Sequence, residues 1–79
     1  MKVELKLNEK GGFSCYQQDK FVKTATRGMN FTLICKETGE KKLGKIGFSW
    51  SYGYFWVSDL DRSEKKVLSD GMEGILPQE

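Results

Sequence analysis

The side chains that could carry chemistry in this sequence are two cysteines, a short acidic cluster and a run of aromatic residues. No histidine is present, so the side chain that most often serves as a general base is missing. Asp59, Asp61 and Glu64 carry the oxygen ligands that Mg²⁺ prefers, but such acids more often solvate a loop. Cys15 has no basic neighbour in the chain to activate its thiol. We therefore expect no enzymatic activity, no metal and no cofactor.

The two cysteines are also poor candidates for a structural bridge or a zinc site. Cys15 and Cys35 are the only cysteines in the chain. In a reducing cytosol, such residues stay as free thiols and are mostly buried as small apolar side chains. Two cysteines without histidine cannot complete a structural zinc site. We expect both thiols to be free, with a disulfide as the less favoured alternative.

The strongest chemical feature is the aromatic run Phe48–Trp56, which holds six of the ten aromatic residues. Gly47 flanks this run and Gly53 interrupts it, a pattern typical of a β-hairpin. Aromatic side chains on a sheet surface are favoured anchors of protein interfaces. They also form stacking platforms for single-stranded nucleic acid. The hairpin is therefore the candidate contact site.

Two registers of this hairpin are possible, and they expose different rings. With Tyr52 and Gly53 as a two-residue turn, one face of the hairpin is wholly apolar: Ile46, Phe48, Trp50, Phe55 and Val57. Tyr54 and Trp56 then stand on the opposite face among glycine and serine residues. We prefer this register because it separates apolar residues from small and polar ones.

The alternative register has the three-residue loop Ser51–Gly53, which ends in a left-handed glycine. The second strand then turns over, because successive side chains of a strand point to opposite faces. Tyr54 and Trp56 would face inward in this register, and Phe55 and Val57 would face outward.

The preferred register predicts a partner-binding face built on exposed rings and nearby lysines. Tyr54 and Trp56 would be its anchors, unless the apolar residues Ile75 and Leu76 cover them. A second, weaker candidate is the lysine-rich turn before the hairpin, which could bind phosphates, although interleaved glutamates favour a plain charged turn. The predicted partner-binding residues are Tyr54, Trp56, Lys45, Tyr16, Lys41 and Lys42.

Short strands joined by tight turns must position these residues. Val3, Leu5 and Leu7 alternate with charged residues, which predicts a half-buried strand, and Phe13 and Cys15 are expected to face inward on the next one. The predicted strands span residues 1–7, 13–18, 21–26, 31–36, 43–51 and 54–60. Residues 67–68 begin either a last strand or one helical turn.

This pattern predicts an all-β fold, a small antiparallel meander or barrel of the SH3-like or OB-like kind. We expect five to six short strands and at most one short helical turn near the C-terminus. Gly44 and Gly47 predict a bulge or sharp bend in the first strand of the hairpin. The 79 residues should form a single domain, 1–79, with residues 75–79 as a frayed tail.

Charge and hydropathy bear on location and partners. The net charge is +2, but it divides into +5 over residues 1–58 and −3 over residues 59–79. The basic part could attract an anionic partner while the acidic part limits non-specific binding. With no apolar signal segment after Met1 and no stretch long enough to span a bilayer, we expect a cytoplasmic protein without a membrane partner.

These features favour a small stand-alone module that binds the surface of a larger protein or ribonucleoprotein. Phage or mobile-element inhibitors, such as anti-CRISPR and other anti-defence proteins, work in this way. The alternative is a small β-barrel that binds single-stranded nucleic acid through an aromatic platform and flanking lysines.

Overall fold

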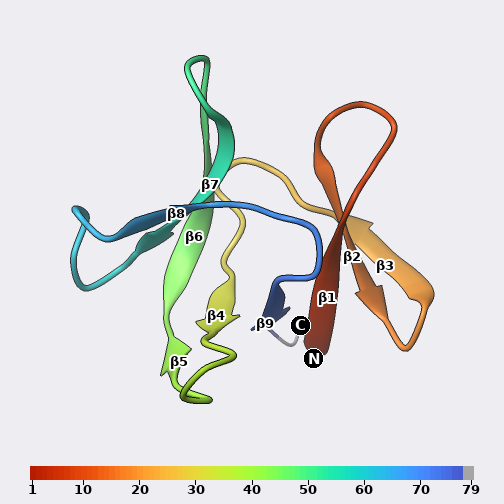
Figure 1. The fold of residues 1–79 in the computed structure, drawn as a ribbon, viewed down its shortest axis with the longest axis horizontal. Helices are drawn as coiled ribbons and strands as arrows, with labels where there is room; N and C mark the ends of the chain where they lie inside the picture. The colour runs from red at the N-terminus through yellow and green to blue at the C-terminus, as the bar shows by residue number, and fades with distance from the viewer. Residues whose placement is uncertain (78–79) are drawn as a thin grey trace.

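The computed structural model describes residues 1–77, which form nine β-strands and no helix (Figure 1). The strands are β1 (Lys2–Leu7), β2 (Phe13–Gln17), β3 (Lys20–Thr24), β4 (Thr32–Ile34), β5 (Lys41–Lys42), β6 (Gly44–Ser49), β7 (Gly53–Ser58), β8 (Lys65–Val67) and β9 (Glu73–Ile75). They make two antiparallel sheets, and neither sheet closes on itself. The all-β antiparallel prediction is therefore confirmed, but five to six strands was too few.

The larger sheet has six strands in the order β3-β2-β1-β9-β4-β5. Its centre is β9, in which Gly74 pairs with Val3 of β1 on one side and with Leu33 of β4 on the other. The next residue after β9, Leu76, is buried and donates its N–H to the carbonyl of Met1 at 2.8 Å. The expectation of a frayed segment is therefore wrong for residues 75–76, and residues 78–79 lie outside the described part.

The smaller sheet has the order β6-β7-β8 and continues into the larger one through residues 28–31. This segment runs beside β6 before it enters β4. Ile46 donates its N–H to the carbonyl of Met29, and Phe31 donates its N–H to the carbonyl of Gly44, each at 2.9 Å. The exposed edge of β6 is thus covered, and the two sheets are held together by backbone bonds.

One apolar core lies between the sheets. Trp56 is at its centre, fully buried, and its indole Nε1 donates a hydrogen bond of 2.9 Å to the carbonyl of Phe31. The other buried apolar residues are Val3, Leu5, Phe13, Cys15, Ala25, Phe31, Leu33, Ile46, Leu68 and Leu76. The inward orientation of Phe13 and Cys15 is confirmed. The prediction for Leu7 is wrong, because its side chain is 60% exposed at the end of β1.

The register of the β6–β7 hairpin differs from the preferred prediction. Ile46 pairs with Trp56, Phe48 pairs with Tyr54, and Trp50–Tyr52 form the loop. Tyr54 and Trp56 therefore share the inner face with Ile46, as the three-residue-loop alternative required, although the pairing is shifted by two positions from that alternative. The preferred register was wrong in placing Trp56 outside and Trp50 inside.

Glycines explain why this register wins. A Cβ on Gly44 would lie 2.4 Å from the indole of Trp56, and a Cβ on Gly47 would lie 2.5 Å from the ring of Phe55. Each ring therefore lies directly on a glycine of the neighbouring strand. The pairing of β6 with β7 shows no register shift, so the hairpin has no bulge at these glycines. They make room for rings instead.

Candidate functional site

The free end of the β6–β7 hairpin projects beyond the two sheets (Figure 1). Rings on its inner face become more exposed with distance from the core. Trp56 is 0% exposed, Phe48 is 37% exposed, and Trp50 in the loop is 95% exposed. The same face that supplies the core therefore ends in rings that the protein leaves uncovered.

Ring contacts hold the exposed side chains on their neighbours. Trp50 packs edge-on against Phe48, with ring centroids 5.4 Å apart, and Phe48 packs against Tyr54 at 4.9 Å. On the other side of the loop, Tyr52 lies tilted against Phe55 at 5.4 Å. Such contacts add about 0.5–1.5 kcal/mol each to area burial. We call Phe48, Trp50 and Tyr52 the tip cluster.

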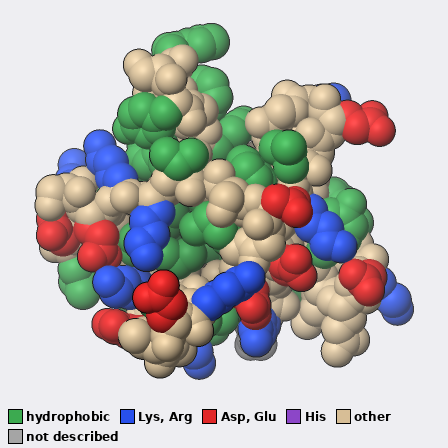
Figure 2. Space-filling view, viewed as in Figure 1, with side chains coloured by type: hydrophobic (Ala, Val, Ile, Leu, Met, Phe, Trp, Pro, Cys, Tyr) green, Lys and Arg blue, Asp and Glu red, His purple; other side chains and the backbone are tan. Residues whose placement is uncertain are grey.

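The tip cluster belongs to an uncharged part of the chain. No charged residue lies between Lys45 and Asp59 in the sequence. Figure 2 shows hydrophobic side chains gathered at the free end of the hairpin, with lysine and arginine side chains lower on the same side. An exposed apolar patch with charged surroundings is the usual form of a contact surface.

The opposite, outward side of the three-stranded sheet has a different character. Side chains here come from alternate positions of the paired strands: Lys45 and Gly47 of β6, Phe55 and Val57 of β7, and Lys65 and Val67 of β8. We call these six residues the outer face. The Phe55 ring lies across Gly47, and the Lys65 ammonium stands 5.4 Å from the centre of that ring.

The structure separates the anchors that the sequence predicted. Trp56 is fully buried and Tyr54 is half-buried, both on the inner face. Their predicted exposure side by side is wrong, because the register turned β7 over. Lys45 is exposed but lies on the outer face, opposite Val57, so it does not flank either ring.

The other predicted binding residues lie on the six-stranded sheet. Tyr16 is half-buried on β2, where the Lys6 ammonium stands 5.0 Å from its ring. Lys41 and Lys42 form the short edge strand β5, and Lys41 is exposed. Lys42 forms an ion pair of 3.2 Å with Glu64. The hydrogen bond that Lys42 donates to Glu64 stabilises the ammonium and raises the pKa of Lys42. The predicted site residues therefore do not form one surface.

The acidic cluster after β7 has structural partners. The Asp61 carboxylate accepts hydrogen bonds from the hydroxyl of Ser63 at 2.6 Å and from its N–H at 3.0 Å. Both hydrogen bonds lower the pKa of Asp61, and the bond from the Ser63 hydroxyl has the larger effect. Glu64 is occupied by Lys42, as described above. Over residues 1–77, no three His, Cys, Asp or Glu side chains are grouped to hold a metal ion.

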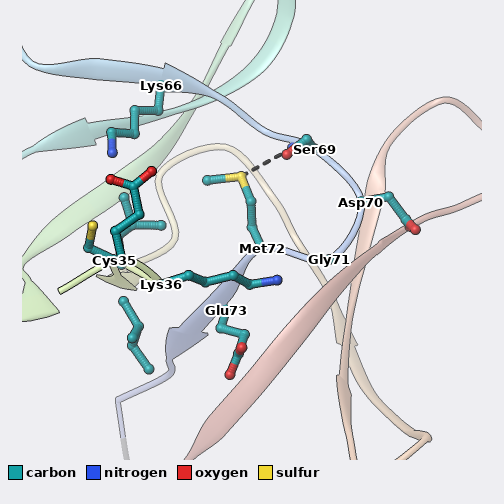
Figure 3. A pocket seen from close by; sticks show the side chains of 11 residues that line it. Cys35, Lys36, Lys66, Ser69, Asp70, Gly71, Met72 and Glu73 are labelled. Atoms are coloured by element: carbon teal, nitrogen blue, oxygen red, sulfur yellow. Dashed lines mark hydrogen bonds between the residues drawn. The ribbon is translucent and has the colours of Figure 1, made fainter. Parts of the chain in front are cut away.

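A shallow hollow of about 300 Å³ lies beside Cys35, at the end of β4. Figure 3 shows Lys66 reaching over one end of the hollow, and the Met72 sulfur accepting a hydrogen bond from the N–H of Ser69 at 3.1 Å. Hydrogen bonding from Thr38 lowers the pKa of the Cys35 thiol. Cys15, in contrast, is buried, and its burial raises the pKa of its thiol. Of the two thiols, Cys35 is therefore the one that ionises more readily.

Sequence reasoning missed the exposed rings Trp50 and Tyr52, and also Phe55 with Lys65 on the outer face. The signal that could have found them was the position of the glycines. A ring that crosses a neighbouring strand needs a residue without a side chain beneath it. Gly44 and Gly47 fit Trp56 and Phe55 in a single register, which also sends Trp50 into the loop.

No protein-family model matches the sequence, and no curated protein or solved structure matches the chain. Within residues 1–77, no helix has the length and apolar character needed to cross a membrane.

Proposed function

We propose that the protein is a binding module that occupies the surface of a larger protein or ribonucleoprotein through the tip cluster of the β6–β7 hairpin. The observation that carries the proposal is Trp50, whose side chain is 95% exposed at the end of a projecting hairpin. Tryptophan and tyrosine are the residues most enriched among interface anchors, where they fill pockets of the partner.

The chemistry of the tip cluster specifies the partner's surface. The tip has no charge, so a matching surface is a concave apolar pocket rimmed by hydrogen-bond acceptors for the indole N–H and the Tyr52 hydroxyl. Phe48 already packs edge-on against Trp50, with ring centroids 5.4 Å apart. Because this contact restricts the Trp50 side chain in the free protein, less side-chain entropy is lost on binding.

Covering a surface is sufficient for function in phage and mobile-element inhibitors, such as anti-CRISPR proteins. We propose this class for the protein. The expected partner is then a protein or ribonucleoprotein of a cell's defence machinery.

The test is a comparison of wild type with a Trp50→Ala, Tyr52→Ala variant, because both side chains lie outside the core. Partners captured from cell lysate are identified by mass spectrometry, purified, and titrated with each protein by calorimetry. Loss of anchors of this kind costs about 2 kcal/mol or more each, so the double variant should bind at least about 700-fold more weakly. Leu60→Ala is the matched control, because that side chain is 91% exposed but lies outside the hairpin.

Two results would overturn the proposal. One is a purified partner that binds the double variant as tightly as wild type. The other is sedimentation of wild type, but not of the variant, with phosphatidylserine-containing vesicles, which would assign the tip to a lipid surface instead.

A further inference from the structure

The outer face of the smaller sheet combines an aromatic ring with cations that form no ion pair within residues 1–77. The Phe55 ring reaches across Gly47 from the central strand β7, and Lys45 and Lys65 occupy equivalent positions on the two flanking strands, both opposite Val57. Two strand spacings separate the lysine backbones, about 10 Å. Phe55 itself pairs with Gly47 and Val67, two positions along from the lysines, and the Lys65 ammonium reaches over its ring.

These residues line one open hollow of about 510 Å³ together with Arg62, Ser58 and Asp59. A volume of this size is in the range of small-molecule sites. Three cations and one carboxylate lie around it, so its net charge is positive. Phe55 is half-buried, and the Lys65 ammonium stands 5.4 Å from its ring centre, so a base that stacks on the ring takes the place of this ammonium.

The acidic residues elsewhere do not neutralise this hollow. Within residues 1–77, the three ion pairs join Lys2 with Glu73, Lys6 with Asp19 and Lys42 with Glu64. None of them involves Lys45, Arg62 or Lys65. Of the ten lysine and arginine side chains within residues 1–77 that lie outside these three ion pairs, three line this hollow.

We infer that the outer face binds single-stranded nucleic acid, at a site that adjoins the tip cluster where Tyr52 packs against Phe55. One unpaired base stacks on Phe55, and the three cations around the hollow contact backbone phosphates. A hollow lined by an aromatic ring and three cations has the two features that sequence-tolerant recognition of single strands requires. Duplex nucleic acid would not place a base on the ring, because its bases are already stacked on one another.

The test uses fluorescence anisotropy with a fluorescein-labelled oligothymidylate of about 12 nucleotides, a length that spans the usual site size. With three phosphate contacts, log K should fall with log[salt] with a slope of about −2. Phe55→Leu keeps an apolar side chain without the aromatic face and should weaken binding at least about fivefold. Lys45→Gln with Lys65→Gln should reduce the slope to about −0.7.

Matched controls distinguish this site from general charge and from the tip. Lys20→Gln with Lys23→Gln removes the same charge from exposed positions on β3 and should leave binding and slope unchanged. Trp50→Ala should also leave oligonucleotide binding unchanged, so failure of one proposal does not imply failure of the other. Urea unfolding of each variant checks that the fold is retained.

Several outcomes would overturn the inference. These are no binding at low salt, equal binding of a duplex of the same length, or an equal loss in the β3 double variant. Unchanged binding by Phe55→Leu would also overturn it, since the ring would then have no role. Tighter binding of a polyglutamate peptide than of the oligonucleotide would assign the outer face to an acidic protein partner.

Discussion

Cys15 and Cys35 differ in the two properties that control thiol reactivity, access and pKa. Cys15 is buried on β2, and its burial raises the pKa of its thiol. Cys35 is partly exposed, and hydrogen bonding from Thr38 lowers the pKa of its thiol. At a pH below both values, a lower pKa gives a larger thiolate fraction, and the thiolate is the reactive form.

We predict that Cys35 reacts with a disulfide reagent such as DTNB about tenfold or more faster than Cys15 in the folded protein. The rate of Cys35 should also level off at a lower pH as the pH is raised, since its thiol ionises first. Titration of wild type at pH 8 should count one fast thiol under native conditions and two in denaturant. Cys35→Ser should remove the fast phase. Two equally fast thiols would show that Cys15 is accessible.

The aromatic residues show what a sequence can and cannot reveal about single positions. Alternation identified Phe13 and Cys15 as inward-facing, because each strand there has one clear apolar face. In the run Phe48–Trp56 both faces carry rings, so composition could not decide between Trp50 and Trp56. The hydrogen bond from Trp56 to the carbonyl of Phe31 depends on residues 25 positions apart, which no local pattern contains.

At the scale of elements, the β6–β7 hairpin serves two purposes at different points along its length. The part near β8 supplies Ile46 and Trp56 to the core, and the part beyond it supplies the exposed tip cluster. Glycines beneath Trp56 and Phe55 fix the pairing. A slip of one residue would place both rings over side chains and turn Trp56 out of the core.

Truncation of the two tryptophans of the hairpin should therefore lower the free energy of unfolding by very different amounts. Trp56→Ala removes a fully buried ring and leaves the carbonyl of Phe31 without its donor, so we expect a loss of roughly 3–5 kcal/mol in the free energy of unfolding. Trp50→Ala removes an exposed ring and its edge-on contact with Phe48, so it should lower that free energy by no more than about 1.5 kcal/mol. Urea unfolding followed by circular dichroism measures both. A larger loss for Trp50→Ala than for Trp56→Ala would instead support the hairpin register that we preferred from the sequence.

For the whole molecule, acidic residues of the C-terminal part help to hold that part against the rest of the chain. The sequence suggested an acidic C-terminal part set apart from a basic body. In the structure, Glu73 pairs with Lys2 and Glu64 pairs with Lys42, so acids of the last third bind lysines of the first two thirds. The carboxylate of Asp70 likewise accepts the N–H of Leu7 at 2.9 Å. Sequence reasoning found the asymmetry but not these partners, because each pair is more than 20 residues apart.

The same non-local character hid β9 from sequence reasoning. Its three residues include Gly74, which lacks a strand-forming side chain, so local propensity gives no signal. A Cβ at Gly74 would lie 2.1 Å from the ring of Phe31, which shows that glycine is needed there for packing. The strand forms because its backbone pairs with β1 on one side and with β4 on the other, two strands about 30 residues apart in the sequence.

We therefore predict that a chain ending at Met72 cannot fold. It lacks β9, which pairs with both β1 and β4, and it lacks the buried side chain of Leu76. Without β9 the six-stranded sheet divides in two, and fragments of two or three short strands are marginal in water. Urea titration should show no cooperative transition in this variant. Glu73→Gln is the control: it keeps β9 and loses only the surface ion pair with Lys2, worth about 1 kcal/mol at most, so its transition should remain. A truncated chain that still unfolded cooperatively near the wild-type midpoint would mean that β1 and β4 are held together by the core alone.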